Sequence, residues 1–85
     1  MANPQCQVLF FSTLRDVTGL ESLTWSLPAE PVTAGQILSK LADRFPALRP
    51  YLPNILVAVN QEFVKLDHPV TAGCELAFMP PLQGG

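Results

Sequence analysis

The chain has 85 residues, of which 48% are hydrophobic and 14% charged, and its net charge at pH 7 is −2. This length fits one domain, and the hydrophobic content excludes an intrinsically disordered chain. The scattered lysines and arginines offer no basic surface of the kind that binds nucleic acid. No apolar run is long enough to span a bilayer, and no basic segment typical of a signal peptide begins the chain. We therefore expect a cytoplasmic protein without nucleic-acid or membrane partners.

The first quarter of the chain predicts two strands. Residues 7–12 are rich in β-branched and aromatic residues, and both faces of this strand are apolar. Residues 13–20 contain Asp16 and Gly19 and are interpreted as a turn or loop. In residues 21–27, leucine and tryptophan alternate with serine and threonine, which predicts a half-buried strand antiparallel to the first.

Residues 32–46 carry the one clear helical pattern. Thr33 is a good N-cap, and Gln36 follows three residues later, which predicts a capping box. Pro46 ends the helix because it disfavours helical geometry at the residue before it. Since a small domain must bury its only helix, we expect the apolar stripe in the core, with a partner-binding face as the alternative. The stripe consists of Ile37, Leu38, Leu41, Ala42 and Phe45.

The second half of the chain predicts three further strands. After a proline-punctuated connection, residues 55–66 predict two short strands around a turn at Asn60 and Gln61. Another turn follows, in which Gly73 is the expected positive-φ residue. Residues 74–80 predict the last strand, which a right-handed crossover through the helix would place parallel to the first.

This order of elements predicts an α+β fold. A mixed sheet packed on one main helix is the ubiquitin-like β-grasp roll, which we expect over residues 1–81, with residues 82–85 as a flexible tail. One helix covers only one face of a sheet, and we expect Val8, Phe10, Leu76 and Phe78 to face it. Contiguous apolar side chains on the other face suggest a protein interface, with a covering loop as the alternative. These side chains are Leu9, Phe11, Phe63 and Met79.

The thiols and the histidine predict no bound metal. Cys6 and Cys74 lie near opposite ends of the chain, and His68 is the one histidine. These spacings do not match a zinc site. We expect His68 in a turn and two buried, reduced thiols, as is usual in the cytoplasm. A disulfide or a catalytic thiol is the alternative.

The C-terminal segment predicts a reactive end. Pro80 and Pro81 end the last strand and favour extended backbone. The five residues from Pro81 to Gly85 reach at most about 17 Å, and glycines without a Cβ fit a narrow channel. The terminal carboxylate is ionised and is a poor electrophile. It therefore needs activation, for which adenylate transfer from ATP is the usual route.

These residues resemble the small subunit of molybdopterin synthase. The most specific matches are the sequences AVNQ, DHP and PP and the terminal GG, in the expected order. The resemblance implies the β-grasp fold and no bound cofactor. It also implies that a ubiquitin-activating-type adenylyltransferase uses ATP to adenylate Gly85, and that a sulfurtransferase converts the adenylate to a thiocarboxylate.

The resemblance further implies how the sulfur is used. Gln83 and Gly84 would enter the large synthase subunit with Gly85, which would pass its sulfur to a cyclic pyranopterin phosphate to build the molybdopterin dithiolene. Catalytic residues are expected on the large subunit, in an assembly of two large and two small subunits. The interface positions that the family pattern implies are Phe11, Phe63, Met79 and Arg15.

Two positions depart from the family pattern, and three other functions stay open. Met79 stands where phenylalanine is common, and Cys74 stands where an acidic residue is usual. The alternatives are a thiamine-pathway sulfur carrier, a ubiquitin-like modifier conjugated to lysines, and an interaction domain with an accidental Gly-Gly end. The DHP and FMPPLQGG segments and the length disfavour the thiamine-pathway carrier.

Overall fold

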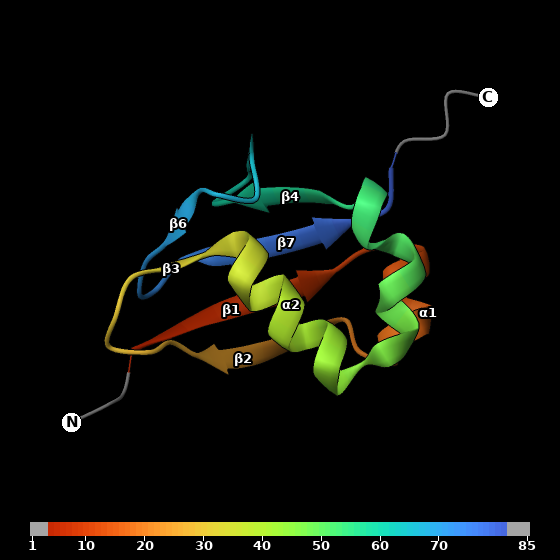
Figure 1. Ribbon diagram of the computed structural model, residues 1–85, viewed down its shortest axis with the longest axis horizontal. Helices are drawn as coiled ribbons and strands as arrows, with labels where there is room; N and C mark the ends of the chain where they lie inside the picture. Colours follow the sequence, from red (N-terminus) through yellow and green to blue (C-terminus); the bar gives the residue numbers. More distant parts are fainter. Residues whose placement is uncertain (1–3, 82–85) are drawn as a thin grey trace.

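A five-stranded mixed sheet with one long helix on one face forms the body of the protein (Figure 1). The computed structural model describes residues 4–81. The predicted α+β class and the ubiquitin-like β-grasp roll are confirmed. In chain order the elements are β1 (Gln5–Phe10), α1 (Thr13–Thr18), β2 (Ser22–Ser26), β3 (Val32–Thr33), α2 (Ala34–Arg44), the 3-10 helix η1 (Pro46–Asn54), β4 (Leu56–Val59), β5 (Glu62–Val64), β6 (Pro69–Val70) and β7 (Glu75–Met79).

The strand order of the main sheet is β2-β1-β7-β4-β5, and β3 pairs with β6 in a separate ribbon. The first and last strands, β1 and β7, lie side by side and parallel, with Val8 opposite Leu76 and Phe10 opposite Phe78. Strand β2 runs antiparallel to β1, and β4 runs antiparallel to both β7 and β5. Both strand pairings predicted from the sequence, β1 with β2 and β1 with β7, are therefore confirmed.

Helix α2 begins with the predicted capping box. The Gln36 amide N–H donates to Thr33 Oγ1 at 3.2 Å, and the Thr33 amide N–H donates to Gln36 Oε1 at 2.9 Å. These two bonds satisfy amides that the helix itself leaves without partners. The helix ends at Arg44, whose guanidinium lies 5.2 Å from the ring centroid of Phe45. Both ends of the helix are therefore set by residues that are its neighbours in the sequence.

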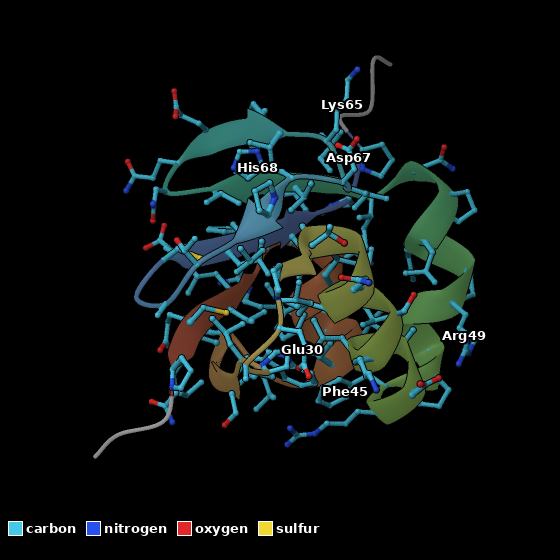
Figure 2. The ribbon with its side chains drawn as sticks, turned by 60° about the vertical axis from the view of Figure 1, so that its left-hand side comes forward. Glu30, Phe45, Arg49, Lys65, Asp67 and His68 are labelled. Carbon is cyan, nitrogen blue, oxygen red and sulfur yellow. The ribbon has the colours of Figure 1, made fainter. Side chains whose placement is uncertain are left out.

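The core lies between α2 and the sheet. Leu41 is fully buried, and Phe45 meets the ring of Phe10 edge-on, with ring centroids 6.3 Å apart. Figure 2 shows Phe45 at the end of α2, beside the sheet. The four sheet residues expected to face the helix, Val8, Phe10, Leu76 and Phe78, are at most 2% exposed. The apolar stripe of the helix is thus core, and the partner-binding alternative for it is wrong.

Residues 13–20, which the sequence analysis interprets as a turn or loop, instead contain the short helix α1. The helix holds Leu14, which is fully buried. It ends at Gly19, whose φ of 76° lies in the left-handed region and whose N–H donates to the Arg15 carbonyl at 2.8 Å. A left-handed glycine is a common way for a helix to end. The glycine that suggested a turn is therefore the C-cap of a helix.

Two predicted turns are confirmed. Asn60 and Gln61, with φ of 51° and 72°, join β4 to β5 in the doubly left-handed geometry of a tight hairpin. Gly73, with φ of 83°, precedes β7. Its N–H donates to the Gln5 carbonyl, while the Cys74 carbonyl accepts from the Gln7 N–H. Gly73 and Cys74 therefore lie opposite the single residue Cys6, and this extra residue forms a β-bulge at this end of the sheet.

Within residues 4–81, none of the helices has the length and apolar character that crossing a membrane requires.

Candidate functional site

The face of the sheet opposite α2 carries an apolar patch at one end. Strand register places Leu9 beside Ala77, Ala77 beside Ala58, and Ala58 beside Phe63. Phe63 is 68% exposed and Phe11, just beyond β1, is 44% exposed, whereas Leu9 and Met79 are half-buried. We call this patch the docking face. It consists of Leu9, Phe11, Leu56, Ala58, Phe63, Ala77 and Met79.

The other end of the same sheet face is polar. Gln7 on β1 lies opposite Thr24 on β2, and Thr24 Oγ1 donates to Gln7 Oε1 at 3.3 Å. Glu75, at the start of β7, shares this end. The apolar side chains are thus gathered at the end where β1 and β7 finish, and no described segment of residues 4–81 covers Phe63 or Phe11. The covering-loop alternative for these two residues is wrong.

The docking face continues into a groove at the point where the C-terminal segment leaves β7. Ser12 and Thr13, at the start of α1, form one side of this groove, and Phe63 lies on another. Ser12 adopts a φ of 56°, a left-handed backbone conformation that is costly for a non-glycine residue. The groove is lined by Ser12, Thr13, Leu56, Phe63, Met79, Pro80 and Pro81. Pro80 and Pro81, which follow β7, therefore line the same groove as Phe63 and Met79.

The structure brings three of the four expected interface residues to this end of the sheet and places the fourth elsewhere. Phe11, Phe63 and Met79 belong to the docking face. Arg15, in contrast, lines a separate surface hollow with Glu21, to which its guanidinium lies 4.0 Å away. An exposed pair of this kind contributes little to stability. The predicted roles of these residues in binding a partner stay predictions.

Sequence reasoning missed Leu56, Ser12 and Thr13. Leu56 lies in a continuously apolar stretch, so alternation cannot assign its face without knowing that it pairs with Met79. Ser12 and Thr13 reach the groove because α1, which the sequence does not predict, starts there. The predicted tail residues Gln83, Gly84 and Gly85, and the boundary after residue 81, lie outside the described residues and stay predictions.

The two cysteines form a buried pair at the opposite end of β7. Cys6 and Cys74 are 3% and 4% exposed, and both are free thiols. Burial, and secondarily the neighbouring Cys74, raises the pKa of the Cys6 thiol to about 11. The Cys6 thiol therefore stays protonated near neutral pH, which argues against a nucleophilic role, since the thiolate is the nucleophile.

No Cys–His pair forms in the described part of the chain. His68 is exposed in the turn between β5 and β6, as expected, whereas both thiols are buried. Figure 2 shows His68 near Asp67 and Lys65 on this connection. Within residues 4–81, no group of three or more histidine, cysteine, aspartate or glutamate side chains is arranged to hold a metal ion.

The raised pKa of Cys6 predicts a loss of stability at high pH. In the unfolded chain the thiol deprotonates near pH 9, while in the folded chain it keeps its proton up to about pH 11. The folded state thus binds more protons in this window, so the free energy of unfolding falls as the pH rises. Between about pH 8 and pH 10.5, wild type should lose on the order of 1–2 kcal/mol more than Cys6→Ala in urea denaturation. Parallel pH profiles of the two proteins would contradict the assignment.

Comparison with known proteins identifies the family. The model of the ThiS family matches residues 8–85. The molybdopterin synthase sulfur carrier subunit of Escherichia coli (strain K12) is 39% identical over 80 residues, covering 93% of this chain and 98% of the relative. The recognition made from the sequence is confirmed.

Two solved structures share the fold. The crystal structure of Haloferax volcanii small archaeal modifier protein 1 has a TM-score of 0.78 and 26% identity, and covers 94% of this chain and 100% of that chain. A structure of the complex of subunits 1 and 2 of the molybdopterin-converting factor from Helicobacter pylori has a TM-score of 0.65 and 21% identity, covering 95% and 99%. With a family match over nearly its whole length, the chain belongs to the ThiS family, among the sulfur carrier subunits of molybdopterin synthase.

Proposed function

We propose that the docking face binds the large subunit of molybdopterin synthase while the C-terminal segment carries sulfur on Gly85 into that subunit's active site. The observation that supports this proposal is the continuity of the docking face with the groove that holds Pro80 and Pro81. A partner that covers Phe63 and Met79 is thereby already in contact with the segment that leads to Gly85. Binding and delivery of the chain end are then one event.

The sulfur must be loaded before delivery. A carboxylate does not exchange oxygen for sulfur unaided, because its leaving group would be an oxide. In the proposed sequence, a Gly85 carboxylate oxygen attacks the α-phosphate of ATP on a ubiquitin-activating-type adenylyltransferase and releases pyrophosphate. A sulfurtransferase then supplies sulfur at the oxidation level of sulfide, which attacks the acyl carbon and displaces AMP, and the product is a C-terminal thiocarboxylate. ATP is a substrate of that partner and is not a resident cofactor of this chain.

The thiocarboxylate then acts inside the large subunit. Its sulfur bonds to a side-chain carbon of a cyclic pyranopterin phosphate, and an oxygen substituent of that carbon leaves. Hydrolysis of the resulting thioester then returns Gly85 as a carboxylate and leaves the sulfur on the pterin. Two such deliveries build the dithiolene of molybdopterin. This chain supplies the sulfur and the docking contacts, while the large subunit supplies the catalytic residues, in an assembly of two large and two small subunits. Gly84 has no Cβ, which suits a narrow passage to Gly85.

Phe63→Asp tests the docking face. The side chain is 68% exposed, so the monomer should remain folded, but a carboxylate would be buried without a partner in the complex, which is costly. We expect the dissociation constant for the large subunit to rise at least about 100-fold, as for a residue central to an interface. Isothermal titration calorimetry measures this change.

Gln5→Asp is the matched control for that experiment. Gln5 is exposed on the same sheet face, at the polar end, and the substitution adds the same charge. Its binding should differ from wild type by less than about threefold, since surface changes away from a contact have small effects. Equal loss of binding in both variants would point to a general charge effect, and unchanged binding of Phe63→Asp would remove Phe63 from the interface.

A protein modifier is the second candidate, because the likeness to small archaeal modifier protein 1 covers 94% of this chain. The same adenylated end could be attacked by a lysine amine instead of a sulfur nucleophile. Intact mass of the protein after incubation with ATP, the activating enzyme and a sulfur donor separates the two. Replacement of one oxygen by sulfur supports the carrier, and an isopeptide-linked adduct supports the modifier.

A further inference from the structure

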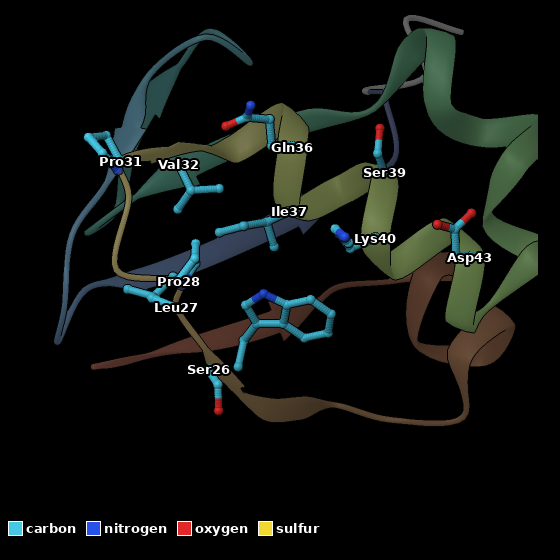
Figure 3. A pocket seen from close by; sticks show the side chains of 11 residues that line it. Ser26, Leu27, Pro28, Pro31, Val32, Gln36, Ile37, Ser39, Lys40 and Asp43 are labelled. Carbon is cyan, nitrogen blue, oxygen red and sulfur yellow. The ribbon is translucent and has the colours of Figure 1, made fainter. Parts of the chain in front are cut away.

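A second groove lies between strand β2 and helix α2, on the side of the sheet away from the docking face. Its volume is about 740 Å³, within the range of known ligand sites. Figure 3 shows Lys40 and Asp43 on the helix side, with Leu27 and Pro28 across the groove from them. The apolar part of the lining includes Trp25, Leu27, Pro28 and Val32, while Ile37, which also borders the groove, is only 1% exposed and belongs to the core.

The strand beside this groove has a free backbone edge. Strand β2 lies at one edge of the sheet, beside β1. The Leu27 N–H donates to the Pro4 carbonyl at 2.8 Å, and the Phe10 N–H donates to the Glu21 carbonyl at 2.9 Å. Hydrogen-bonded residues alternate along an antiparallel pair. Along β2, the N–H and C=O groups that point away from β1, with no strand beside them in residues 4–81, are therefore those of Ser22, Thr24 and Ser26.

The groove also carries one uncompensated charge. Asp43 is held by Arg49, whose guanidinium donates to its carboxylate at 2.7 Å. Lys40, one turn earlier on α2, takes part in neither of the two ion pairs found within residues 4–81. The rim therefore presents a positive charge to whatever occupies the groove.

We propose that the β2–α2 groove binds an extended peptide segment of a partner protein, with alternate apolar side chains and an acidic residue that contacts Lys40. A strand added to β2 would satisfy the outward backbone groups of Ser22, Thr24 and Ser26. Every second side chain of that strand would enter the apolar lining, because side chains alternate across a strand. An extended acidic-apolar peptide matches all three features: the free edge, the apolar lining and the cation.

This site leaves the docking face free. The groove lies on the helix side of the sheet, whereas Phe63 and Met79 lie on the other side. A peptide in the groove and a subunit on the docking face can therefore be bound together. The proposal goes beyond sulfur delivery, since it assigns this carrier a second partner.

The probe is a synthetic capped nine-residue peptide in which four valines alternate with three threonines and two aspartates follow. Trp25 lines the groove and is the chain's one tryptophan, so its fluorescence reports on occupancy. We expect a saturable blue shift. Lys40→Glu should weaken binding about tenfold, since it replaces attraction by repulsion. For a peptide with lysines in place of the aspartates we expect the opposite order, with tighter binding to Lys40→Glu than to wild type.

Thr24→Pro tests the backbone edge. Proline is tolerated on an edge strand where the N–H faces away from the sheet, so the fold should remain intact. The substitution removes one outward donor and obstructs an added strand, and we expect binding to weaken at least about fivefold. Lys40→Glu keeps the proposal testable if Thr24→Pro unfolds, because Lys40 is exposed on α2.

Three results would overturn the proposal. The first is the absence of a saturable change in Trp25 fluorescence up to about 1 mM peptide, the weakest range of specific binding. The second is loss of peptide binding in Phe63→Asp but not in Lys40→Glu, which would place the peptide on the docking face. The third is a dimer in sedimentation that Thr24→Pro dissolves, which would assign the edge to a second copy of the chain.

Discussion

Leu41→Ala is expected to lower the free energy of unfolding by about 2–5 kcal/mol. Leu41 is fully buried in the middle of α2, against the sheet. Truncation removes its burial and leaves a cavity that a close-packed core fills only in part. Since a domain this small has only a few kcal/mol of net stability, a measurable fraction of the variant should be unfolded without denaturant. Urea denaturation followed by circular dichroism measures the change.

Ser39→Ala is the matched control for Leu41→Ala. Ser39 lies on the exposed side of the same helix, and alanine is the stronger helix former, so stability should change by less than about 0.5 kcal/mol. If Leu41→Ala were as stable as Ser39→Ala, the helix stripe would not carry the core.

Helix α2 could be predicted from the sequence because its determinants are local. Thr33 and Gln36 satisfy each other's backbone groups within one turn, and Pro46 stops the helix without help from other elements. Helix α1 could not be predicted from the sequence, because six residues cannot form a stable helix alone. It forms because Leu14 is drawn into the core and Gly19 closes its end. Because a glycine at this position is also compatible with a loop, the sequence alone does not distinguish a short helix from a loop here.

The docking face could be predicted only in outline. Alternation in residues 7–12 and 74–80, with one main helix on the other face, was enough to place Phe11 and Met79 on the exposed face, and Phe63 was expected to join them. The position of Leu56 on this face could not be predicted, because it depends on the register of β4 with β7, which are far apart in the chain. The groove lined by Pro81 could not be predicted, because it depends on the turn at Ser12. The positive φ of Ser12 does not follow from the conformational preferences of serine.

The β2–α2 groove shows what a local pattern leaves out. Alternation of Leu23, Trp25 and Leu27 predicts one buried face of a strand, and these residues are half-buried as expected. The pattern does not tell which strands lie at the edges of the sheet. That property follows from β7 lying between β1 and β4, so that β2 is left with a single neighbour.

One serine added after Gly85 is expected to abolish adenylation while leaving the fold intact. The extra residue follows the last strand and touches no core position. It moves the carboxylate by up to about 3.6 Å, and displacements of about 1 Å can cost 100-fold when reacting atoms must nearly touch. We therefore expect ATP–pyrophosphate exchange with the cognate activating enzyme to fall at least about 100-fold.

Gly84→Val tests whether a side chain beside the chain end blocks adenylation even when the carboxylate is not moved along the chain. The chain keeps its length, so the carboxylate remains on residue 85, but a β-branched side chain is added at the residue before it, where glycine has no Cβ. Exchange should again fall at least about 100-fold, since the carboxylate cannot reach the nucleotide. Binding of the large subunit should weaken by much less than in Phe63→Asp, because the docking face is unchanged in both tail variants. If the serine-extended protein were activated at the wild-type rate without first being trimmed, the Gly85 carboxylate would not be the reacting group, and the sulfur-carrier mechanism would fail.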